Sequence, residues 1–92
     1  MLIKASGTSM FPTLIDGGIY ELIEVDPASL DVGEIVVYKQ GDIYICHRII
    51  RKICFFNGKV YFKTKGDNCV EYDKIAVDAH SVIGKIDLKY GN

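Results

Sequence analysis

The run Asp42-Ile-Tyr-Ile-Cys-His-Arg-Ile-Ile-Arg-Lys-Ile53, followed after the dipeptide Asn57-Gly58 by Lys59-Val-Tyr-Phe-Lys-Thr64, carries the clearest structural signal of the chain. Both runs are rich in β-branched and aromatic residues, which favour strands. Asn-Gly favours a type I′ hairpin, because both central residues of that turn must tolerate positive φ. The sequence therefore predicts two antiparallel strands, at 42–53 and 59–64, joined by a tight turn.

Three further runs have the same composition, and helical spacing is nowhere sustained. They are Ile19–Val25, Glu34–Lys39 and Val82–Leu88. The segment 26–33 contains Pro27 and lacks alternation, so it is expected to be a connection with one helical turn. We therefore predict an all-β fold: a small, mostly antiparallel sheet or barrel.

Length and charge restrict both the organisation and the partners. A chain of 92 residues that is 49% hydrophobic normally forms one domain, here 1–92. Eleven basic against twelve acidic side chains give a net charge of −1, which offers no electrostatic footprint for nucleic acid or an anionic membrane. The apolar stretches are far shorter than the roughly 20 residues of a membrane-spanning helix. No nucleic-acid partner and no transmembrane segment are expected.

The cysteines indicate a reducing environment. Cys46, Cys54 and Cys69 cannot all pair within one chain, and their spacings match no Cys-x-x-Cys metal or redox site. Free thiols are typical of a reducing compartment, so the expected location is cytoplasmic. The sequence predicts neither a metal site nor a cofactor.

The stretch Ser6-Gly-Thr-Ser-Met-Phe-Pro-Thr-Leu14 is expected to form a rigid loop. Pro12 fixes φ and lacks an amide hydrogen, while Gly7 permits unusual backbone angles and close approach to another backbone. Such a loop can present the hydroxyl of Ser9 without burying it. A loop serine is ordinary by itself, so a catalytic assignment has to rest on its companions.

A histidine is the first companion. Alternation along the 42–53 strand places His47 on one face with Ile43, Ile45 and Ile49. One interpretation is a core histidine satisfied by a backbone carbonyl. The other is a general base, which an apolar environment keeps neutral and able to accept a proton. The adjacent Cys46 faces the opposite side, so we expect it to serve packing and not a Cys–His pair.

Two aspartates follow. Asp67 lies in a Gly-Asp-Asn turn at 66–68, where its ordinary role is to cap the turn, and Asp73 is by default a solvated loop carboxylate. A serine hydroxyl becomes a good nucleophile when a base takes its proton and an anion orients that base. Ser9, His47 and one of the two aspartates supply those three parts, which favours a serine hydrolase.

These motifs resemble those of type I signal peptidases, in chain order and over nearly the whole sequence. Ser9-Met-Phe-Pro-Thr-Leu14 resembles the family's nucleophile box, and Val32-Gly-Glu-Ile-Val-Val-Tyr38 resembles its Gly-Asp-Ile-Val strand, with Glu34 in place of aspartate. His47-Arg48 falls where bacterial enzymes carry Lys-Arg and where archaeal and endoplasmic-reticulum enzymes carry His-Arg. Gly66-Asp-Asn68 with Asp73, and Val82-Ile-Gly-Lys-Ile86, are similar to the closing motifs of that second type.

The resemblance implies a Ser-His-Asp mechanism on a signal-peptidase or LexA-like fold. Ser9 attacks the peptide carbonyl and His47 accepts its proton, while Asp73 or Asp67 orients the imidazole; the sequence leaves open which of the two does so. Oxyanion and substrate contacts are expected from Ser9, Gly7 and Met10, with the backbone amide of Ser9 as one donor. Signal peptidases often have a serine two residues before the nucleophile, where this chain has Gly7 and so resembles LexA-type peptidases more.

The implied reaction is cleavage of a leader or signal-like peptide from a precursor protein, with small residues preferred before the cut. Signal peptidases normally carry a membrane anchor before the nucleophile, whereas eight residues precede Ser9 here. Three explanations of this difference remain open. The substrate is a soluble precursor, a partner holds the enzyme at the membrane periphery, or an anchor has been removed. Two alternatives are a LexA-type self-cleaving regulatory domain and a catalytically inactive relative that binds peptides as an added strand.

Overall fold

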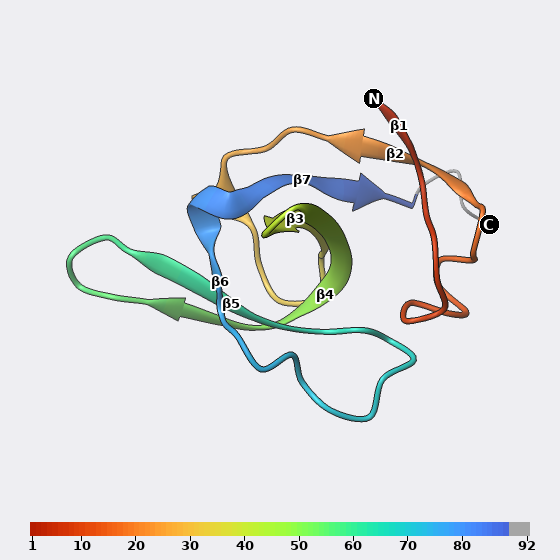
Figure 1. Cartoon of the computed structure of the whole chain (residues 1–92). Coiled ribbons are helices and arrows are strands. Elements are labelled where there is room, and N and C mark those ends of the chain that lie inside the picture. The colour runs from red at the N-terminus through yellow and green to blue at the C-terminus, as the bar shows by residue number, and fades with distance from the viewer. Residues whose placement is uncertain (89–92) are drawn as a thin grey trace.

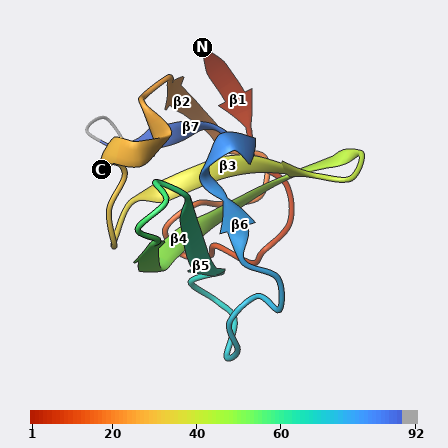
Figure 2. The ribbon, with the colours of Figure 1, turned by 90° about the vertical axis from the view of Figure 1, so that its left-hand side faces the viewer.

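The computed structural model describes residues 1–88, which form one curled antiparallel sheet (Figures 1 and 2). Its strands are β1 (Leu2–Lys4), β2 (Ile19–Ile23), β3 (Ile35–Gln40), β4 (Ile43–Cys54), β5 (Val60–Lys65), β6 (Val77–Asp78) and β7 (Val82–Asp87), in the order β1-β2-β7-β3-β4-β5-β6. Two 3-10 turns, η1 (Pro27–Ser29) and η2 (Ala79–Ser81), complete the described elements. No helix within residues 1–88 is long and apolar enough to cross a bilayer. The all-β, antiparallel prediction is confirmed.

The five predicted strands are all present, with ends that differ by one or two residues. The short edge strands β1 and β6 have no sequence signal, because two or three residues cannot display alternation; pairing with β2 and β5 holds them. The predicted helical turn is η1. Pro27 suits its first position, and Asp26 caps it by accepting a hydrogen bond from the amide of Ala28.

The turn between β4 and β5 differs from the predicted type I′ hairpin. Within residues 1–88 every residue with positive φ is a glycine, so Asn57 does not adopt the conformation that this turn requires. Gly58 alone takes the left-handed position, at φ 89°, and its amide donates to the carbonyl of Phe55 at 2.9 Å. The side chain of Asn57 accepts a hydrogen bond from the amide of Lys59. The two phenylalanines lengthen the connection, and a turn followed by a left-handed glycine closes it.

Two clusters of buried side chains lie on opposite faces of β3, which is therefore buried on both sides. Val36 and Tyr38 point into the first cluster, and Ile35 and Val37 point into the second. The first cluster contains Leu30, Val36, Tyr38, Ile49, Phe62, Val77, Ala79 and Val82; the second contains Met10, Leu14, Leu22, Ile35, Val37 and Ile86. Strand β3 thus gives β4, its neighbour, a rigid support.

Candidate active site

Strand β4 positions His47 at the edge of the first core cluster. Ile45 and Ile49 both contact that cluster, so His47 lies on the predicted face, and its side chain is 12% exposed. Cys46 packs against the second cluster instead. Burial raises the pKa of the Cys46 thiol to about 12, which keeps it protonated at neutral pH and makes it a poor nucleophile.

Ser9 lies in the loop between β1 and β2, which is anchored on both sides of the serine. Met10 is only 4% exposed and belongs to the second core cluster. Gly7, at φ 86°, donates its amide to the carboxylate of Asp16 at 2.9 Å. A residue with a Cβ rarely adopts this φ. Because Asp16 occupies the amide of Gly7, that amide is not available as an oxyanion donor.

The structure brings Ser9, His47 and Asp73 together from three distant segments. Oγ of Ser9 lies 3.1 Å from Nε2 of His47, and Nδ1 of His47 lies 2.6 Å from Oδ2 of Asp73. An ionised carboxylate only accepts hydrogen bonds, so Nδ1 carries the proton that bonds to Asp73. In the neutral ring Nε2 is then the acceptor, and the hydroxyl of Ser9 donates to it. This is the geometry that a serine nucleophile and its base require.

Two buried hydroxyls hold Asp73 in place. Thr64 is fully buried, and its hydroxyl donates to Oδ2 of Asp73 at 2.7 Å. The hydroxyl of Tyr38 makes a longer bond, 3.4 Å, to the same oxygen. Burial raises the pKa of Tyr38 to about 12, so this hydroxyl stays a donor. Neither residue carries a sequence signal beyond its inward position in a strand; only the tertiary structure identifies them as supports of the carboxylate.

Asp67, the other candidate carboxylate, binds elsewhere. Its two oxygens accept a bidentate pair of hydrogen bonds from Nε and Nη2 of Arg48, at 2.8 and 2.7 Å. The hydroxyl of Thr13 donates to it at 2.6 Å. Arg48 lies on β4 and Thr13 on the loop of Ser9, so Asp67 fastens that loop to the strand of His47. Its hydrogen-bonding role is to support the loop, whereas Asp73 contacts the imidazole.

The turn around Asp67 also contacts the nucleophile loop through its backbone. The amide of Asn68 donates to the carbonyl of Ser9 at 2.8 Å, and its side-chain amide donates to the carbonyl of Thr8 at 3.1 Å. Gly66 approaches so closely that a Cβ there would lie 2.6 Å from the carbonyl oxygen of Ser9. The 66–68 turn therefore sets the distance between the two loops.

The ion pair between Asp67 and Arg48 makes the stability of the fold depend on pH. The hydrogen bonds from Arg48 lower the pKa of Asp67 below its ordinary value of 3.8. A carboxyl whose pKa is lower in the folded state stabilises the fold above the unfolded value and loses that contribution as pH falls through the folded value. We expect Asp67→Asn to lower the free energy of unfolding by about 1–3 kcal/mol at pH 7. Below about pH 4 the stability of the variant should fall less than that of the wild type.

Urea titrations at a series of pH values measure this difference. Asp42→Asn is the matched control, because Asp42 is exposed and makes no ion pair within residues 1–88. The same pH profile for wild type and Asp67→Asn would contradict the assigned role.

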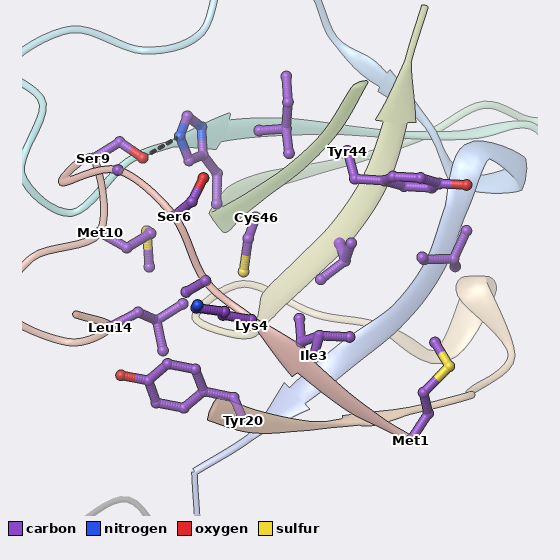
Figure 3. A pocket seen from close by; sticks show the side chains of 16 residues that line it. Met1, Ile3, Lys4, Ser6, Ser9, Met10, Leu14, Tyr20, Tyr44 and Cys46 are labelled. Carbon is purple, nitrogen blue, oxygen red and sulfur yellow. Dashed lines mark hydrogen bonds between the residues drawn. The ribbon is translucent and has the colours of Figure 1, made fainter. Parts of the chain in front are cut away.

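A cavity of about 610 Å³ opens beside Ser9 and His47. Figure 3 shows the hydroxyl of Ser9 pointing at the imidazole at one end of this cavity, while Tyr44 and Met1 lie toward the other. Its lining comes from β1, the Ser9 loop, β2, β3, β4 and β7 and is mainly apolar: Met1, Ile3, Lys4, Ala5, Ser6, Gly7, Ser9, Met10, Leu14, Tyr20, Val37, Tyr44, Ile45, Cys46, His47 and Ile83. Gly7 and Met10, expected at the site from the sequence, are both among them.

The described part of the chain shows neither a metal site nor a disulfide. Within residues 1–88 no group of three His, Cys, Asp or Glu side chains is arranged to hold a metal ion. Cys46, Cys54 and Cys69 are all free thiols.

No protein-family model matches the chain, and searches of curated proteins and of solved structures find no match either.

Proposed function

We propose that this chain is a serine endopeptidase of the signal-peptidase type, which removes a leader or signal-like peptide from a precursor protein. The observation that carries the proposal is the hydrogen-bonded series from Ser9 through His47 to Asp73 at the end of an apolar cavity. The sequence motifs of that family support it, because they contain all three residues.

In the proposed reaction the hydroxyl oxygen of Ser9 attacks the carbonyl carbon of the scissile peptide bond. Nε2 of His47 takes the hydroxyl proton and later delivers it to the leaving amine. Asp73 keeps the ring in the tautomer that accepts at Nε2 and stabilises the imidazolium that forms. Water, deprotonated by His47, then hydrolyses the acyl-enzyme and frees Ser9.

The negative charge on the carbonyl oxygen needs hydrogen-bond donors. The backbone amide of Ser9 is the first donor that we assign. Since Gly7 donates to Asp16, we assign the second to the hydroxyl of Ser6, which lines the same cavity (Figure 3) and makes no hydrogen bond within residues 1–88. This arrangement would replace the serine that signal peptidases often carry two residues before the nucleophile.

The substrate is an extended peptide of the precursor, with small residues before the cut. Strand β1 is an edge of the sheet, and residues 43–47 of β4 pair with β3 alone, so both offer backbone groups to a peptide lying in the cavity. The same free edges favour a second candidate, a catalytically inactive relative that binds a peptide as an added strand.

Covalent capture distinguishes the two candidates. A peptide whose terminal alanine carries an aryl phosphonate ester in place of its carboxyl is expected to phosphonylate Oγ of Ser9 with release of the phenol. Mass spectrometry should then find the tryptic peptide that contains Ser9 heavier by the mass of the reagent minus the phenol. Ser9→Ala protein should bind the same peptide without modification, and an analogue ending in phenylalanine should react more slowly. Peptide binding by the wild type without capture would support the inactive relative, and labelling at a residue other than Ser9 would contradict the assigned nucleophile.

A further inference from the structure

The β4–β5 hairpin concentrates positive charge in a chain whose net charge is −1. Residues 43–65 contain six of the eleven Lys and Arg residues and none of the twelve Asp and Glu residues. Of these six, Arg48 alone forms an ion pair among residues 1–88, with Asp67. The ammonium groups of Lys52 and Lys65 reach backbone carbonyls instead. The overall charge therefore conceals a local positive excess.

Strand register places basic and aromatic side chains on one face of this hairpin. Arg51 of β4 lies directly opposite Lys63 of β5, and opposed residues of antiparallel strands point to the same side. Tyr61 precedes Lys63 by two residues and shares that side. Phe62 and Thr64, on the other side of β5, are fully buried. Arg51, Tyr61 and Lys63, which we call the hairpin face, therefore point away from the core.

The hairpin face holds two like charges, Arg51 and Lys63, directly opposite each other. Cations placed directly opposite each other destabilise a sheet. Neither Arg51 nor Lys63 has a carboxylate partner within residues 1–88. Asp78 of β6 lies opposite Tyr61, but its side chain accepts a hydrogen bond from the backbone amide of His80 and so caps η2. Two cations against the carboxylate of Asp78 leave the face net positive, which is complementary to an anionic surface outside the chain.

Two aromatic rings stand at the tip of the same hairpin. Phe55 is 50% exposed and packs edge-on against Tyr61, with ring centroids 5.8 Å apart. Phe56 is fully exposed. Figure 1 shows the hairpin projecting on the left of the molecule, away from the red N-terminal loop that holds Ser9, and Figure 2 views the projecting end from the front. No residue of the 55–58 tip lines the cavity, so a surface that contacts the two rings need not cover it.

We propose that the hairpin face and its tip dock on an anionic lipid bilayer. Phe55 and Phe56 enter the apolar boundary beneath the headgroups, and Arg51 and Lys63 lie against the anionic headgroups. A single-stranded nucleic acid fits less well, because its bases stack on aromatic residues along a groove, whereas these rings stand on a projecting turn. The proposal does not rest on the proposed hydrolysis, since no residue of this surface lines the cavity.

Tryptophan fluorescence tests insertion of the tip, because the chain has no tryptophan of its own. Emission of Phe56→Trp protein is expected to shift to the blue with vesicles of phosphatidylcholine and phosphatidylserine in equal parts, and to be quenched by lipids brominated in the acyl chains. Vesicles of phosphatidylcholine alone should produce neither change. Ile19→Trp is the matched control, since Ile19 is 58% exposed on β2, and its emission should not respond.

Vesicle sedimentation tests the charges. The double variant Arg51→Gln/Lys63→Gln is expected to bind the anionic vesicles roughly tenfold or more weakly. Lys39→Gln/Lys74→Gln makes the same change in net charge at exposed positions elsewhere and should bind like the wild type. Circular dichroism checks that each variant is folded. Equal binding to neutral and anionic vesicles, an unresponsive probe at position 56, or tighter binding to a single-stranded oligonucleotide than to vesicles would each overturn the proposal.

Discussion

Replacing Asp73 by asparagine is expected to lower kcat by about 10⁴-fold while KM changes little. The carboxylate of Asp73 lies 2.6 Å from Nδ1 of His47 and requires the proton to be on that nitrogen. An asparagine side chain can present its NH₂ group there instead, which favours the tautomer with the proton on Nε2. That ring cannot accept the proton of Ser9. Steady-state cleavage of a fluorogenic leader peptide measures the loss.

Asp67→Asn is the matched control for this prediction, because it changes the same chemical group in the neighbouring turn. Asp67 bonds to Arg48 and Thr13 and does not contact the imidazole, so its replacement should reduce stability and lower kcat much less than the replacement of Asp73 does. Thermal unfolding of both variants separates the two effects. Comparable losses of kcat in Asp67→Asn and Asp73→Asn would show that Asp73 has no special part in orienting His47.

Gly66→Ala is expected to lower kcat/KM on the order of 10²-fold, although Gly66 has no side chain that could take part in the reaction. A Cβ at this position would lie 2.6 Å from the carbonyl oxygen of Ser9, 2.8 Å from Sγ of Cys69 and 3.2 Å from Nε2 of His47. The cysteine can rotate away, but the backbone of Ser9 cannot yield without moving its hydroxyl. A displacement of about 1 Å at reacting groups is enough for a loss of this size.

Gly41→Ala serves as the control for the glycine substitution. Gly41 has φ 63° and open space around its Cα, so alanine there adds backbone strain of about 1–2 kcal/mol without a clash. It lies in the β3–β4 turn, outside the cavity lining, and kcat/KM should be unchanged. Full activity of Gly66→Ala would show that the 66–68 turn does not set the position of the nucleophile loop.

The strands were predictable where they are long enough to show a pattern. β3 and β4 contain runs of β-branched and aromatic residues, and His47 lies on the face that alternation assigns to it. The short strands β1 and β6 were not predictable, because their hydrogen bonds depend on partners that only the folded chain supplies. The turn at Asn57-Gly58 is not the type I′ turn that the dipeptide predicts, because the preference of a dipeptide takes no account of the two phenylalanines before it.

The candidate site divides in the same way. Motif order points to Ser9 and His47, but it leaves two aspartates as candidates for the third member, because both are loop carboxylates shortly after β5. What separates them is the environment that each side chain meets, namely Thr64 and Tyr38 around Asp73 and Arg48 beside Asp67. The backbone amide of Gly7 is likewise decided by the tertiary structure, because no local sequence pattern predicts its hydrogen bond to Asp16.

The sequence by itself determined the strand pattern, the face of His47 and the chemical parts of the candidate site, because alternation and turn preferences act between near neighbours. The tertiary structure alone decided which carboxylate holds the imidazole, which backbone amide is already occupied and how basic side chains gather on one face of the β4–β5 hairpin. The physical reason is distance along the chain: 38 residues separate Ser9 from His47 and 26 separate His47 from Asp73. Contacts over such separations are set by sheet register and core packing, which no local stretch encodes.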